Sequence, residues 1–110
     1  MPQAEAWLRT EEALRRYELV AIITPQVTDD ELPDAIDRLL KKPVENQGGV
    51  CDDVNVWGRR RMAYPIKRHT EGNYVLTNIQ LDPSKTNELE QGLLISEEVL
   101  RHLLVRLDDE

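Results

Sequence analysis

The sequence predicts an α+β fold in which a four-stranded antiparallel sheet carries two helices on one face and leaves the other face open. Segments with strand and helix patterns follow one another in the order strand, helix, strand, strand, helix, strand. The chain has 110 residues, which suits one domain, and 40% hydrophobic with 32% charged residues is typical of a folded globular protein. Right-handed connections place both helices on the same face of the sheet.

The first strand is predicted at Tyr17–Ile23, because this segment is short, rich in branched residues and almost continuously apolar. Such a strand is buried on both faces, as a central strand is. A helix follows, with apolar residues at helical spacing: Leu32, Ile36, Leu39 and Leu40. Its N-cap is either Thr28, in a capping box with Glu31, or Asp30, which would place Pro33 within the first turn.

The middle of the chain predicts a break in this helix and then a long strand. Pro43 either ends the helix or kinks it, and in the second case the helix continues to Asn46. The second strand is predicted at Val50–Pro65, with a bulge or bend at Gly58. Because Pro65 has no N–H to donate to a neighbouring strand, this strand is expected at an edge of the sheet.

The last third of the chain predicts a strand, a helix and a final strand. The turn before the third strand is predicted at Glu71–Asn73, and the strand itself at Tyr74–Leu81, where residue types alternate. Asp82 is expected to cap the second helix, with Pro83 in its first position. The fourth strand is predicted at Val99–Leu107. This order of elements is the ferredoxin-like βαββαβ pattern.

Alternation along the strands divides their side chains between the two faces of the predicted sheet. In the first strand the helix-facing residues are Leu19, Ala21 and Ile23. In the fourth strand Leu100, His102, Leu104 and Arg106 are assigned to one face and Val99, Leu103, Val105 and Leu107 to the other. The open face then carries Glu18, Val20, Ile22, Tyr74, Leu76 and Leu104. So many apolar groups on an exposed face predict a protein partner.

A basic run interrupts an otherwise acidic chain. The formal net charge is −7, yet five of the 14 Lys and Arg residues lie between Arg59 and Arg68, and no acid lies between Asp53 and Glu71. The guanidinium group is a rigid fork of donors that suits phosphate, so the run predicts contact with RNA backbone. A solvated edge strand protected against aggregation is the alternative. Alternation places Arg59 and Arg61 on one side and Arg60 on the other, unless the bulge changes the phase.

Other residues extend this prediction. Arg15 and Arg16 begin the first strand and are candidates for RNA contact, although a polar strand entrance explains them too. Trp57 and Tyr64 either stack on a base or pack at the bend, and packing is favoured. The candidate RNA-binding residues are Arg15, Arg16, Arg59, Arg60, Arg61, Lys67 and Arg68. The candidate partner-binding residues are Val20, Ile22, Trp57, Tyr64, Tyr74, Leu76 and Leu104.

Residues for catalysis are missing from the pattern. The two histidines are far apart, Cys51 has no histidine near it, and no Cys or His spacing suggests zinc, so neither a metal nor a cofactor is expected. A small hydrolase of this fold is disfavoured, because the loop from Thr24 to Asp29 offers neither glycine nor arginine for an anion. The chain has no apolar run that could span a bilayer and no basic leader, and a single cysteine fits a reducing cytosol.

Three stretches of the chain resemble a known family. Arg15-Arg16-Tyr17-Glu18, the run from Trp57 to Ile66 and Gly72-Asn73-Tyr74 are similar to the bacterial small-subunit ribosomal proteins of the S-six family. The run Trp-Gly-Arg-Arg-Arg-Met-Ala-Tyr-Pro-Ile is the most specific of the three, and the resemblance extends from about Arg15 to Arg106.

The resemblance implies a non-enzymatic, ferredoxin-like domain of the cytoplasmic ribosome. Its members bind the central domain of 16S ribosomal RNA together with the basic ribosomal protein S-eighteen. On this basis residues 1–14 are expected to be an N-terminal extension, residues 15–107 the domain, and residues 108–110 an acidic end. The alternative function is a regulatory ligand-binding domain that dimerises through its open sheet face, and fold alone does not separate the two.

Overall fold

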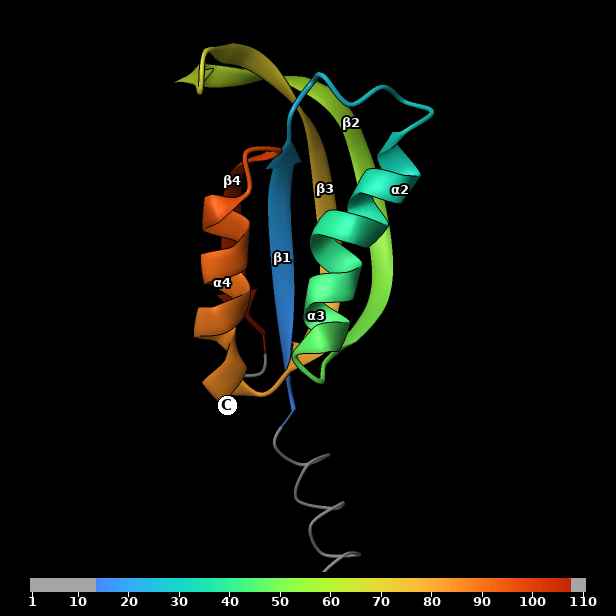
Figure 1. The fold of residues 1–110 in the computed structure, drawn as a ribbon, viewed down its shortest axis with the longest axis vertical. Helices are drawn as coiled ribbons and strands as arrows, with labels where there is room; N and C mark the ends of the chain where they lie inside the picture. The colour runs from blue at the N-terminus through green and yellow to red at the C-terminus, as the bar shows by residue number, and fades with distance from the viewer. Residues whose placement is uncertain (1–13, 108–110) are drawn as a thin grey trace, which may run out of the picture.

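The computed structural model describes residues 14–107, so the predicted acidic end and all but the last residue of the N-terminal extension lie outside the described residues. The elements in chain order are β1 (Arg15–Ile23), α2 (Leu32–Ile36), η1 (Asp37–Lys41), α3 (Lys42–Asn46), β2 (Val50–Ile66), β3 (His69–Leu81), η2 (Pro83–Lys85), α4 (Thr86–Ile95) and β4 (Val99–Arg106). The strands form one antiparallel sheet in the order β2-β3-β1-β4. The helices α2 and α3 and the helix α4 all cover the same face of the sheet (Figure 1), which confirms the predicted ferredoxin-like fold.

The first helical segment, made of α2, η1 and α3, continues through Pro43, as predicted by the alternative in which Pro43 kinks the helix and does not end it. The turn from Asp37 to Lys41 is a π-helix between two α-helical segments, and the helix ends at Asn46. Because proline has no N–H, a widened turn just before it accommodates the missing hydrogen bond.

The start of this helix lies later than either predicted cap. The helix begins at Leu32, so Thr28 and Asp30 do not cap it, but Pro33 does occupy the first turn. One half of the capping box is present nonetheless, because the backbone N–H of Thr28 donates to the carboxylate of Glu31 at 3.2 Å. The second helical segment begins as predicted, with Asp82 accepting from the backbone N–H of Ser84 at 3.0 Å.

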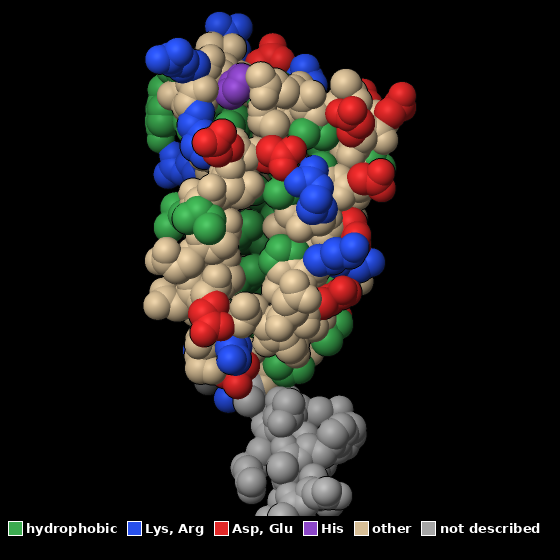
Figure 2. All heavy atoms as spheres, in the orientation of Figure 1, with side chains coloured by type: hydrophobic (Ala, Val, Ile, Leu, Met, Phe, Trp, Pro, Cys, Tyr) green, Lys and Arg blue, Asp and Glu red, His purple; other side chains and the backbone are tan. Residues whose placement is uncertain are grey.

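The main core lies between the sheet and the helices. Leu19, Ala21 and Ile23 of the central strand β1 are fully buried there, which confirms their predicted direction. The helices contribute Leu32, Ile36, Leu40, Val44, Leu89 and Leu93, and β3 contributes Val75, Ile79 and Leu81. Apolar side chains of this core are visible in the seam between the two helical columns (Figure 2).

Two predictions about the strands are wrong. The turn between β2 and β3 is at Lys67–Arg68, and Glu71–Asn73 lies inside β3. In β4, the register shifts between Ile22 and Ile23 of the neighbouring strand, which inserts an extra residue at the start of β4 and reverses the alternation after Leu100.

This reversal places Leu104 on the helix face, not on the open face. Leu104 pairs with the buried Leu19 and packs against the main core. Leu103 and Val105 face the open side instead, opposite Val20 and Glu18, and their exposed fractions are 59% and 39%. Leu104 therefore leaves the candidate partner surface, and Leu103 and Val105 join it.

Candidate nucleic-acid interface

The basic run lies in a hairpin that projects beyond the sheet. β1 ends at Ile23, which pairs with Asn73, so the part of β3 before Asn73 pairs only with β2. Figure 1 shows these ends of β2 and β3 curving together over the end of the molecule. In the space-filling view, Lys and Arg side chains gather at this same end (Figure 2).

The bulge at Gly58 sets the direction of the three arginines. The register of β2 against β3 shifts between Val56 and Gly58, and Gly58 has a φ of 94°, a conformation that glycine adopts without strain. Arg59 and Arg61 therefore share the helix-facing side with Val56, whereas Arg60 faces the open side. The predicted division of the arginines is confirmed, and the bulge decides which side each takes.

A small apolar cluster, which we call the hairpin cluster, fixes the hairpin to the sheet. It consists of Ile22, Met62 and Leu100, all buried, with Ile66 and Tyr74 packed against them. Gly72 allows this close approach, because a Cβ at that position would overlap Cγ2 of Ile22. Ile22 is therefore covered by its own chain, whereas Ile66 and Tyr74 of this cluster stay half-buried.

Polar contacts hold the same hairpin on its other side. Lys67 donates from Nζ to the backbone oxygens of Ser96 and Val99, at 3.3 and 3.2 Å. Arg59 donates from Nη2 to the backbone oxygen of Pro25 at 2.8 Å. Lys67 and Arg68 both have positive φ, 51° and 71°, which is the geometry of a two-residue hairpin turn of type I′. Contacts within the chain therefore fix the position of the hairpin.

The remaining arginines of the hairpin present their charge to solvent. Arg61 and Arg68 are exposed and have no ion-pair or hydrogen-bond partner among the described residues. The guanidinium of Arg60 lies 5.9 Å from the ring centre of Trp57, a cation–π distance that leaves its donors available. Trp57 and Tyr64 are 47% and 56% exposed, so they are not part of a core, although Arg60 lies over Trp57 and the hydroxyl of Tyr64 accepts a hydrogen bond from Arg101.

Arg15 and Arg16 lie at the other end of the sheet. They pair with Leu81 and Gln80 of β3, whereas Arg59 pairs with Asn73 of the same strand. Asn73 and Leu81 are eight residues apart along β3, which corresponds to about 26 Å at the usual rise per residue of a strand. The structure thus brings Arg59, Arg60, Arg61, Lys67 and Arg68 to one end of the molecule and leaves Arg15 and Arg16 at the opposite end.

The open face is apolar in its middle and polar beside it. Val20 and Leu76 are half-buried neighbours in adjacent strands, and Leu103 lies across from Val20. Asp53 of β2 accepts from Asn78 at 2.9 Å on this face. Sequence reasoning missed Leu103 because no residue type marks the bulge at the start of β4, and leucines occur on both candidate faces of this strand.

An ion pair removes one potential negative charge near the base of the hairpin. Arg38 and Glu98 are joined at 2.6 Å, and Glu98 directly precedes β4, whose first residue accepts from Lys67. The hydrogen bond from Arg38 lowers the pKa of the Glu98 carboxyl, and Glu98 in turn raises the pKa of Arg38. This carboxylate is therefore already neutralised by a cation of the same chain.

Within residues 14–107 no group of three or more His, Cys, Asp or Glu side chains is arranged to hold a metal. In the same part of the chain, none of the helices has the length and apolar character needed to cross a membrane. Cys51 is half-buried, and this burial raises the pKa of its thiol, so the thiolate is disfavoured.

The fold and the hairpin define a ferredoxin-like α+β protein with an ordered, arginine-rich hairpin at one end of its sheet. Residues 16–106 match the protein family described as Ribosomal protein S6. The small ribosomal subunit protein bS6 of Caldanaerobacter subterraneus subsp. tengcongensis is 36% identical over 96 residues, which are 87% of this chain and 100% of that protein. The bS6 protein of Dehalococcoides mccartyi is 39% identical over 99 residues, 90% of each.

A solved structure agrees with these sequence comparisons. The crystal structure of 30S ribosomal protein S6 from Thermotoga maritima is similar with a TM-score of 0.76 and 33% identity, over 86% of this chain and 88% of that one. The chain belongs to the ribosomal protein S6 family. The resemblance to the S-six family is confirmed, and the prediction that the chain is not an enzyme is confirmed because its relatives are named as ribosomal proteins.

Proposed function

We propose that this protein is a structural component of the small subunit of the cytoplasmic ribosome, where it binds the central domain of 16S ribosomal RNA together with protein S-eighteen. The observation that carries the proposal is the ordered hairpin with Arg60, Arg61 and Arg68 exposed on it, in a chain of net charge −7. Membership of the ribosomal protein S6 family supports the same assignment.

The hairpin contacts RNA through phosphate groups and not through base sequence. Arginine forks match phosphate oxygens, and RNA helices expose their backbones and 2′-hydroxyls to proteins more readily than their base edges. Arg60 and Arg61 point to opposite sides of the strand, and Arg68 lies in the turn, so the hairpin inserts between two phosphate backbones or into a bend of one. Exposed Trp57 and Tyr64 are available for stacking on unpaired bases.

Lys67 and Arg59 act mainly as positioning residues in this proposal. Each spends donors on backbone oxygens of the same chain: Lys67 on Ser96 and on Val99 at the start of β4, and Arg59 on Pro25 after β1. These contacts and the hairpin cluster fix the hairpin in advance, so RNA binding loses less conformational entropy. The guanidinium of Arg59 keeps further donors for phosphate.

The open face is the surface for the basic protein partner. Its apolar centre contains Val20, Leu76 and Leu103, and Tyr74 lies between this centre and the hairpin. Glu18 and Asp53 flank the centre, so acids of this face meet cations of the partner. Val20, Tyr74 and Leu76 keep their predicted roles; Arg15 and Arg16, at the far end, stay weaker candidates for RNA contact.

The experiment is assembly of the purified chain with small-subunit ribosomal RNA, with and without protein S-eighteen, followed by sedimentation. We expect the chain to sediment with the RNA only when S-eighteen is present, because a protein of net charge −7 binds RNA weakly alone. Absence of the chain from the RNA fraction in both mixtures would contradict the proposal. A concentration-dependent dimer that excludes S-eighteen would instead support the regulatory domain.

A further inference from the structure

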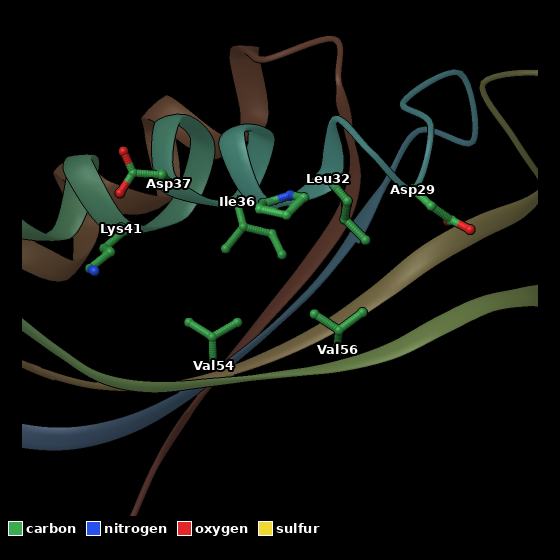
Figure 3. Close-up of a pocket in the computed structure, with 8 residues that line it drawn as sticks. Asp29, Leu32, Ile36, Asp37, Lys41, Val54 and Val56 are labelled. Atoms are coloured by element: carbon green, nitrogen blue, oxygen red, sulfur yellow. The ribbon is translucent and has the colours of Figure 1, made fainter.

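A groove on the helix side of the molecule lies between the first helical segment and the edge strand β2. Its volume is about 490 Å³, and Leu32, Pro33 and Ile36 form one wall. Val54 and Val56 of β2 point toward these residues from the opposite wall (Figure 3). Both valines are accessible, with exposed fractions of 36% and 52%, so the groove has a solvent-exposed apolar lining.

The strand beside this groove has a free edge. β2 is the outermost strand of the sheet, so among the described residues its outer backbone N–H and C=O groups have no strand partner. Three register shifts interrupt β2, and two of them, between Cys51 and Asp53 and between Val56 and Gly58, flank the groove. Bulges usually protect a sheet edge from other strands. Between these two, the regular stretch Asp53–Val56 is left unprotected, and it is this stretch that lines the groove.

The charges around the groove favour a basic occupant. Asp29 and Asp37 line it against one cation, Lys41. The neighbouring cation Lys42 is within 3.7 Å of Asp37 and shares that carboxylate, so Asp29 is the acid of this lining without an ion-pair partner among the described residues. A positively charged segment is therefore attracted to the rim, and an acidic one is repelled.

We propose that this groove binds an extended, basic segment of a partner protein, which adds a strand to the edge of β2. Backbone hydrogen bonds form along Asp53–Val56, alternate apolar side chains of the segment enter between Val56 and Ile36, and its Lys or Arg side chains meet Asp29 and Asp37. The site faces the helices, so it is separate from the open face and independent of RNA contact by the hairpin.

The test uses the full chain and a synthetic peptide of seven alternating lysine and valine residues with blocked ends. Amide NMR spectra are recorded during titration with this peptide, with an alternating glutamate and valine peptide as the charge control. We expect saturable shifts confined to Leu32–Asp37 and Asp53–Val56 with the basic peptide only. The variant Val56→Arg should weaken binding at least tenfold, whereas Leu103→Arg, an equally exposed position on the open face, should leave it unchanged.

Several results would overturn the proposal. Equal binding of both peptides, shifts centred on the open face, or no saturation would show that the groove does not select a basic strand. A shift of the Trp7 indole signal in Val56→Arg without peptide would mean that the chain's own N-terminal segment is the occupant. Self-association that Val56→Arg abolishes would assign the groove to a second copy. Loss of RNA assembly in the same variant would show that the groove and the RNA site are not independent.

Discussion

Removing the two uncommitted arginines of the hairpin should change the salt dependence of RNA binding in a calculable way. Arg61 and Arg68 are exposed and make no ion pair or hydrogen bond within the described chain, so replacing both with alanine removes charge without breaking an internal contact. Each phosphate contact releases counterions and contributes about −0.7 to −0.9 to the slope of log K against log salt concentration. The double variant should therefore have a slope less steep by about 1.4 to 1.8.

This change in slope has a direct consequence for affinity. The ratio of the affinity of the unaltered protein to that of the double variant should fall by about 7- to 12-fold between 50 and 200 mM salt. The reason is that the variant makes two phosphate contacts fewer, so a fourfold rise in salt concentration weakens its binding less. The assay is fluorescence anisotropy with a labelled central-domain RNA, in the presence of saturating S-eighteen and over a series of salt concentrations. The charge-matched control is Lys41→Ala with Lys85→Ala, which removes two cations far from the hairpin.

The control separates local contact from overall charge. If the hairpin contacts phosphate, the Lys41 and Lys85 variant keeps the original slope although its net charge equals that of the hairpin variant. Parallel slopes for the hairpin variant and the unaltered protein would refute the assignment of Arg61 and Arg68 to phosphate. Identical losses in both variants would refute it as well, because the effect would then come from net charge alone.

Outcomes for five further variants follow from the structure. Gly72→Ala should destabilise the fold by about 1–3 kcal/mol in chemical denaturation, because its methyl group overlaps Ile22, whereas the exposed helical Gly92→Ala should stabilise it by about 1 kcal/mol. Asp82→Asn should remove an acid-sensitive part of the free energy of unfolding. Hydrogen bonds from Ser84 lower the folded-state pKa of Asp82, so its carboxylate stabilises the fold at pH values above its unfolded-state pKa. This contribution is lost as the pH falls through the folded-state pKa. Thermal unfolding from pH 2 to 7 checks this, and equal acid sensitivity of both proteins would contradict it. Leu103→Glu should block docking of S-eighteen in a pull-down and leave the melting temperature unchanged, whereas Leu104→Ala should lower the melting temperature and leave docking intact.

Local patterns predicted the elements well because the signals that start and stop them are local. Asp82 followed by Pro83 identified a helix start, and a proline at position 65 identified an edge strand, since each acts through its own backbone groups. The continuation of the first helix past Pro43 was one of two alternatives from sequence, and the π-helical turn before it decided between them.

Gly72 shows where a local reading failed. A glycine between Glu71 and Asn73 predicted a turn, but the glycine serves close packing against Ile22, and the turn falls on Lys67 and Arg68. Both turn residues are non-glycine with positive φ, so no residue type signals the turn. The ammonium group of Lys67 also donates to the backbone oxygens of Ser96 and Val99, and these contacts with residues distant in sequence cannot be read from the turn itself.

The sequence by itself determined the order of the elements, the edge position of β2 and the concentration of arginine in one segment, because these depend on residue type and spacing along the chain. The tertiary structure decided which face each side chain occupies. Single extra residues at the bulges near Gly58 and at the start of β4 reverse the alternation, which places Arg60 on the open face and moves Leu104 into the core. Gly58 marked the first of these bulges in the sequence, but the bulge in β4 is set by the pairing of that strand with β1, so its position follows from cross-strand contacts and not from the residues of β4 alone.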